Sequence, residues 1–219
     1  LEANDWMRKN PKVGAEKVEE WTKINKEVVY VFLGPGGVHT LDPTIKKTWV
    51  DSIGANYAIL QKLNMIKPLD IGAWVNDSYV RQTYKELGLD YDKQLAAYDT
   101  YNVKGTDPVC NVPVDNPKLV GEVWIQGGDI VPFSSPVCTL LGVKKYTAEG
   151  KKFNAVYLVD HELGIKLFAD AAFYAIKADL KKPDVVPFLL KKDAEAHAAK
   201  NGGKVATYAE ALTAINVGQ

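Results

Sequence analysis

Two cysteines and one histidine are the side chains of this sequence best suited to bind a metal ion or to react. Cys110, Cys138 and His161 lie in one stretch of the chain, and the sequence has no other cysteine. Thiolates are ligands that Cu(I) prefers, and two or three of them suffice for this ion. Cys138 is expected at the start of a helix, where the helix dipole favours the thiolate. Two other interpretations stay open, because such cysteines also form a disulfide or lie buried separately.

Histidines supply a second group of candidates. His161 follows Asp160 at the tip of an expected hairpin, where the carboxylate could orient the imidazole for a metal; the alternative is a surface histidine without a role. His39 follows a glycine-rich run at 34–37, whose backbone N–H groups could hold an anion unless the run is only a flexible connection. His197 is expected on a helix, solvated or partly packed. The predicted metal ligands are Cys110, Cys138 and His161, and the predicted ligand-binding residues are His39 and Asp160.

A short motif that occurs twice indicates which elements position these residues. Asp129-Ile-Val-Pro-Phe133 returns as Asp184-Val-Val-Pro-Phe188, and each copy is a strand pattern that leads into a potential helix. Such internal similarity predicts one small structural unit used twice. Both cysteines and His161 lie near the first copy or between the two copies. Any metal or thiol chemistry is therefore expected there.

The pattern of apolar residues changes from helical to strand-like along the chain. One helix is expected from Pro11 to the glycine-rich run, with an apolar stripe formed by Val18, Trp21, Ile24, Val28 and Val31. Residues 102–118 are rich in glycine and proline, which indicates a linker or irregular loop. Beyond them, turns at 126–128 and 161–164 predict two hairpins, the second with strands at 154–160 and 165–176. We expect an α+β protein, with an all-helical segment at 1–103 and an α+β domain at 107–219 that carries a duplicated strand-strand-helix unit on antiparallel sheet.

Composition argues against several classes of protein. The 219 residues include 27 basic and 27 acidic side chains, so no overall charge attracts nucleic acid. No apolar run is long enough to span a bilayer. Glycine-rich phosphate-binding motifs and the Gly-x-Ser-x-Gly motif are absent, so nucleotide and common hydrolase chemistry have no support. The chain begins Leu1-Glu2-Ala3-Asn4 without a secretory segment, which predicts a removed leader or a fragment of a longer protein.

A set of short segments in the second half carries a family resemblance. These segments are Tyr157–Asp160, Asp170–Tyr174, Val186-Pro187-Phe188, Asp193-Ala194 and Gly202-Gly203 followed by Val205. Together they make residues 107–217 similar to NosL, the accessory protein of nitrous-oxide reductase. The resemblance implies a periplasmic or membrane-tethered protein that binds Cu(I) and delivers it to a copper enzyme. Of the family motif Cys-x-x-Cys-Gly-Met only Cys110 is present here, because Asp107 and Val112 stand at the positions of the other cysteine and the methionine.

The first half resembles a different family. The residues that show this resemblance are Asn10-Pro11, Trp21, Pro68-Leu69-Asp70, Val75-Asn76-Asp77 and Gly88-Leu89-Asp90-Tyr91. They are similar to the C-terminal helices of periplasmic solute-binding proteins of the nitrate, sulfonate and taurine type. This resemblance implies an ABC transporter as partner and a small anion as ligand, with the chain as the tail of a larger fusion protein.

Three functional hypotheses follow. The leading one is a periplasmic Cu(I) carrier or chaperone, a binding protein and not an enzyme. Cys110 is expected as its first ligand, with Cys138 and His161 as the next candidates, and the ion passes to an acceptor enzyme by thiolate ligand exchange. The second is a transport-associated receptor for a small anion. The third is a thiol enzyme of the organomercurial-lyase type, a family that shares the NosL-like fold and cleaves carbon–mercury bonds with two cysteines and an aspartate. That hypothesis predicts both cysteines within a few ångströms of a carboxylate.

Overall fold

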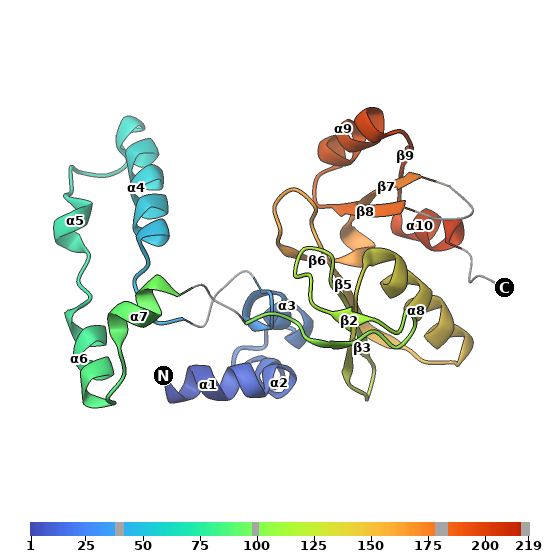
Figure 1. Cartoon of the computed structure of the whole chain (residues 1–219). Coiled ribbons are helices and arrows are strands. Elements are labelled where there is room, and N and C mark those ends of the chain that lie inside the picture. Colours follow the sequence, from blue (N-terminus) through green and yellow to red (C-terminus); the bar gives the residue numbers. More distant parts are fainter. Residues whose placement is uncertain (38–41, 98–100, 178–183, 216–219) are drawn as a thin grey trace. The chain divides into compact units, whose positions relative to one another are not determined.

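The chain divides into two compact units (Figure 1). The computed structural model describes residues 1–37, 42–97, 101–177 and 184–215, apart from the side chains at 52, 55, 56 and 59. Of these, 42–97 and Leu1 form the smaller unit, and 2–37, 101–177 and 184–215 form the larger unit. The mixed α+β class expected from the sequence is confirmed. The division at residues 103 and 107, which rests on composition and resemblance, stays a prediction.

The described part of the smaller unit is helical. Asp70 and Asp90 cap two of its helices by accepting hydrogen bonds from backbone N–H groups. Tyr84 and Tyr91 are buried as a perpendicular ring pair with centroids 5.4 Å apart. No helix among the described residues has the length and apolar character needed to cross a membrane. The helices are α4 (Lys47–Lys62), α5 (Ile71–Trp74), α6 (Ser78–Glu86) and α7 (Tyr91–Ala96).

Three helices open the larger unit, where the sequence predicts one long helix from Pro11 onward. Lys23 adopts a left-handed conformation with φ of 64°, which ends the second helix and separates it from the third. The expected apolar stripe is therefore interrupted: Trp21 is 72% exposed, whereas Val29 and Tyr30 are buried. The helices are α1 (Glu2–Lys9), α2 (Pro11–Thr22) and α3 (Lys26–Leu33).

Antiparallel sheets and the helices that pack on them form the rest of the larger unit, as far as the structure describes it. A four-stranded sheet has the order β4-β3-β5-β6, and a three-stranded sheet has the order β8-β7-β9. A two-stranded ribbon, β1 (Gly105–Thr106) and β2 (Pro113–Val114), precedes them. The strands of the two larger sheets are β3 (Gly121–Ile125), β4 (Ile130–Phe133), β5 (Phe153–Val159), β6 (Lys166–Phe168), β7 (Phe173–Lys177), β8 (Asp184–Phe188) and β9 (Lys204–Ala206).

The duplicated unit is confirmed and is larger than the strand-strand-helix that the sequence predicts. In the first copy the β3–β4 hairpin leads into α8 (Pro136–Ala148), and β5 then pairs with the free side of β3. In the second copy the β7–β8 hairpin leads into α9 (Lys191–Asn201), and β9 pairs with the free side of β7. The repeated Asp-x-Val-Pro-Phe segment is the second strand of each hairpin. Both copies therefore have the same strand order.

The single strand expected at 165–176 is divided between the two sheets. Its first part is β6, which forms the expected hairpin with β5, and its second part is β7, which pairs with β8 and β9. A 3₁₀ turn at Ala169–Ala171 separates the two parts. The hydroxyl of Tyr174 donates to the carbonyl of Ala169 at 2.6 Å and closes this corner. The small buried Ala169 and Ala172 let the chain pass from one sheet to the other.

Helices cover both faces of the four-stranded sheet. Successive strand residues point to opposite faces. Trp124 and Tyr157 accordingly lie in one apolar cluster with residues of α2 and α3, whereas Val123 and Phe133 lie in another with residues of α8. Figure 1 shows α3 and α8 beside this sheet within the larger unit. The helices α2 and α3 thus contribute to the core of the first copy.

The three-stranded sheet is also covered on both faces. Ala175 and Phe188 pack against α9, and Tyr174 and Ile176 pack in a second cluster with α8 and with α10 (Tyr208–Ala214). A capping box between Thr207 and its third helical residue opens α10. The two copies of the repeat therefore share α8 and α10 in one continuous core.

A buried ion pair lies between α3 and the four-stranded sheet. The ammonium of Lys166 lies 2.5 Å from Glu122 Oε2, and the hydroxyl of Tyr30 donates to Glu122 Oε1 at 2.7 Å. The ammonium also lies 4.3 Å from the centre of the Tyr30 ring. Burial lowers the pKa of Lys166, although Glu122 opposes this shift, and burial raises the pKa of Tyr30. This cluster joins α3 to the strands through polar contacts as well as apolar ones.

The protein is expected to lose stability at alkaline pH, because Tyr174 is buried and Tyr208 is partly buried. Burial raises the pKa of Tyr208 to about 12 and moves the pKa of Tyr174 in the same direction. These phenols stay protonated in the folded state, while the unfolded chain ionises near pH 10. The tyrosines should therefore leave the free energy of unfolding unchanged below about pH 10. They should lower it as the pH rises from 10 towards 12. Urea unfolding between pH 8 and pH 11 tests this, and a stability that stays constant over that range would contradict it. Tyr174→Phe should make the decrease shallower, while Tyr79→Phe, at an exposed side chain, should not.

Candidate functional site

A buried aspartate organises the turn that precedes the first copy. The carboxylate of Asp107 accepts hydrogen bonds from the backbone N–H groups of Val109 and Cys110 at 2.9 and 2.8 Å, and from the N–H and hydroxyl of Ser134, both at 2.8 Å. Burial by itself would raise the pKa of Asp107, but these hydrogen bonds hold the pKa below its ordinary value. Asp107 is therefore a charged carboxylate that ties the turn to the end of β4.

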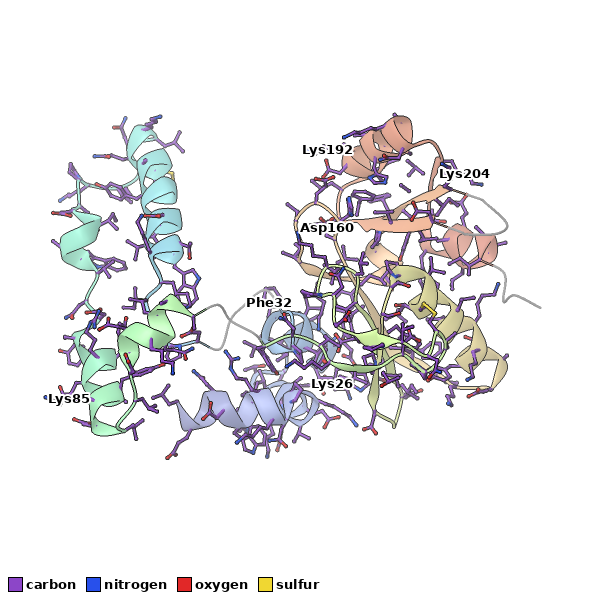
Figure 2. The ribbon with its side chains drawn as sticks, viewed as in Figure 1. Lys26, Phe32, Lys85, Asp160, Lys192 and Lys204 are labelled. Carbon is purple, nitrogen blue, oxygen red and sulfur yellow. A yellow bond between two sulfur atoms is a disulfide. The ribbon has the colours of Figure 1, made fainter. Side chains whose placement is uncertain are left out.

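The two cysteines meet beside this carboxylate. Cys110 and Cys138 form a disulfide with Cα atoms 6.0 Å apart, visible in yellow beside α8 in Figure 2. Cys138 lies in the first turn of α8, as the sequence predicts, and its N–H donates to the capping hydroxyl of Ser135 at 3.1 Å. The two sulfurs and a carboxylate oxygen of Asp107 all lie within 4.8 Å of one another. Of the three interpretations of the cysteines, the structure has the disulfide.

The same turn occurs again before the second copy, around Asp160. Figure 2 labels Asp160, whose carboxylate accepts hydrogen bonds from the N–H groups of Leu163 and Leu189, each at 2.5 Å. Leu189 directly follows the Pro-Phe end of β8, just as Ser134 directly follows the Pro-Phe end of β4. The backbone bonds that close the two turns also correspond, from Asp107 to Val112 and from Asp160 to Ile165. The described role of Asp160 is therefore to join a turn to a strand.

Asp107, Cys110 and Cys138 form one group of potential ligands, the cysteine group, and His161 does not lie in it. It lies with Glu162 and His197, and ligand atoms of these three residues are within 4.8 Å of one another. Neither Glu162 nor His197 is among the metal ligands predicted from the sequence. The repeat contains a signal that could have identified His197. His197 lies on the helix that follows β8, as Cys138 lies on the helix that follows β4, and its position in the second copy is about one helical turn further along. The remaining candidate, His39, lies outside the described residues.

Comparisons with known proteins give one distant structural similarity. No protein-family model matches this chain, and no curated protein matches its sequence. The crystal structure of the copper chaperone NosL from Shewanella denitrificans is similar over 48% of this chain and 88% of that chain, with 18% identity and a TM-score of 0.39. A similarity of this extent carries no conclusion about what this chain binds. None of these comparisons supports the resemblance of the first half to solute-binding proteins.

Proposed function

We propose that this protein is a metal carrier that binds Cu(I) through reduced Cys110 and Cys138 and transfers it by thiolate exchange. The observation that carries the proposal is the convergence of the only two cysteines at one place. Two thiolates form a low-coordinate site for a soft ion, and thiolate ligands select Cu(I) over hard cations. Cys110 is half-buried at the surface of the unit, so an acceptor's ligands can reach one side of the ion.

The disulfide is the oxidised, metal-free state in this proposal. A dithiol reductant supplies two electrons and two protons to the sulfur–sulfur bond and is itself oxidised to a disulfide. Each thiol then loses its proton when it binds the metal. The position of Cys138 in the first turn of α8 favours its thiolate, because the helix dipole is positive there. The site is thereby open to metal only under reducing conditions.

The disulfide is consistent with an extracytoplasmic location, where such bonds persist. We place the carrier in the periplasm, with a copper enzyme as the acceptor of its ion. The sequence resemblance of residues 107–217 to the NosL family supports this placement, since Cys110 matches a family ligand position.

Titration of the reduced protein with Cu(I) against a competing chelator tests the carrier. We expect one ion to be retained per chain. Retention should be lost in the oxidised protein and in Cys110→Ser, because a single thiolate cannot replace the pair. His161→Asn is the matched control and should bind Cu(I) as the unsubstituted protein does, since His161 lies in the other group. The carrier is ruled out by reduced protein that retains no copper, or by retention that Cys110→Ser does not change.

One observation also favours a second candidate, the organomercurial-lyase type of thiol enzyme. A carboxylate lies within 4.8 Å of both sulfurs, as that hypothesis predicts. Protonolysis, however, needs a group that delivers a proton to the carbon of the broken bond, while the hydrogen bonds to Asp107 hold its pKa low. The carrier is therefore the better supported function. Release of benzene from phenylmercury by the reduced protein would reverse this order.

A further inference from the structure

Two histidines from distant parts of the sequence meet at the end of the second copy. The rings of His161 and His197 have centroids 5.1 Å apart and are nearly perpendicular, at 82°. Both rings contact Phe188, with centroid distances of 5.5 and 5.2 Å. Glu162 lies beside them, and one ligand atom from each of the three side chains is within 4.8 Å of the other two.

The backbone holds both histidines in place. The N–H of His161 donates to the carbonyl of Pro187 at 3.0 Å, which ties the turn to β8. The preceding residue, Asp160, is buried and bonded to the N–H of Leu189, as described above. His197 lies in the middle of α9, whose Ala194 and Ala198 pack onto the same sheet. A turn and a helix that are both fixed to one strand therefore set the separation of the imidazoles.

The arrangement repeats that of the cysteine group. In each copy one residue comes from the Asp-anchored turn and the other from the helix that follows the Pro-Phe strand. We infer that the second copy carries a separate site for a divalent transition-metal ion, with His161, His197 and Glu162 as its ligands. The two copies then present different donors, sulfur in the first and nitrogen with oxygen in the second.

The donor set determines the class of ion. Imidazole nitrogens suit Zn(II), Cu(II) and Ni(II), and a carboxylate oxygen completes such sites. A hollow of about 330 Å³ adjoins the three ligands and is lined also by Ala196, Lys200 and Asn201. The side chains of His161 and Glu162 are exposed, so an ion enters from solvent without any movement of the core. Glu162 and Lys200, which carry opposite charges, both line this hollow.

Titration of the oxidised protein with Zn(II), and separately with Cu(II), tests this site. The disulfide removes the thiolates, so the test does not depend on the carrier proposed above. We expect one equivalent of either ion to bind, Cu(II) more tightly than Zn(II). Zn(II) should shift the ring resonances of two of the three histidines in an NMR spectrum. Cu(II) should give an electron paramagnetic resonance signal with nitrogen coupling.

Histidine variants decide between this site and adventitious binding. His161→Asn and His197→Asn should each weaken binding about tenfold or more, and circular dichroism should show that both fold. His39→Asn, which leaves all three ligands in place, is the control and should bind normally. The Cys110→Ser/Cys138→Ser variant should also bind, so the two sites can fail independently. Absence of saturable binding, or equal affinity in both histidine variants and the control, overturns the inference.

Discussion

Replacing Lys166 by methionine is expected to lower the free energy of unfolding by about 3–5 kcal/mol. The substitution leaves Glu122 as a buried carboxylate with Tyr30 as its remaining described hydrogen-bond donor. An uncompensated charge in this position is costly, because burial removes the water that would otherwise solvate it. The affected contacts join α3 to the sheet, so the N-terminal helices should lose their attachment first. Urea unfolding of the variant and of the unsubstituted protein measures the difference.

A second substitution separates the cost of the unpaired charge from the value of the pair. Lys166→Met combined with Glu122→Gln removes both charges and keeps an acceptor for the Tyr30 hydroxyl. We expect the double variant to recover much of the lost stability, as neutral replacements of buried pairs often do. Glu195→Gln, which breaks the exposed pair of Lys191 and Glu195, is the control and should change stability by less than about 1 kcal/mol. If Lys166→Met is as stable as this control variant, the loss of Lys166 does not leave a costly unpaired charge on Glu122, and the prediction is wrong.

Removal of the disulfide is expected to cost about 3–4 kcal/mol. Cys110 and Cys138 are 28 residues apart, and the bond restricts the unfolded chain by closing a loop of that length. The loop includes the β3–β4 hairpin and the start of α8, so the loss should appear as weaker protection of this copy against hydrogen exchange. Urea unfolding of Cys110→Ser/Cys138→Ser, or of the protein under a reductant, gives the magnitude.

The same experiment connects stability with the proposed function. A reductant should have no effect on the double serine variant, which serves as its control. Cu(I) added to the reduced protein should restore stability, by about 2.7 kcal/mol when its free concentration is 100 times the dissociation constant. Equal stability of the reduced and oxidised protein would contradict the expected structural role of the bond. Restoration of the serine variant by Cu(I) would place the ion elsewhere.

Local sequence signals determine most of the elements of this fold. The repeated Asp-x-Val-Pro-Phe segment predicts a strand followed by a helix in both places. A short apolar run and the residues that start a helix are local signals, because each depends on only a few neighbouring positions. Gly127 and Gly164 adopt positive φ in the two expected hairpin turns, which glycine tolerates without strain. The start of α8 before Cys138 follows from the Ser135-Pro136 pair in the same way.

Tertiary packing decided which chemical groups meet. His161 and His197 are far apart in sequence, and they meet because α9 folds back over the sheet that carries Phe188. Trp21 has the spacing of a core residue and yet lies at the surface, since Lys23 ends its helix. Periodicity describes one element at a time, whereas a site depends on the relative placement of several elements. That placement is determined by long-range burial of apolar faces, which no local pattern contains.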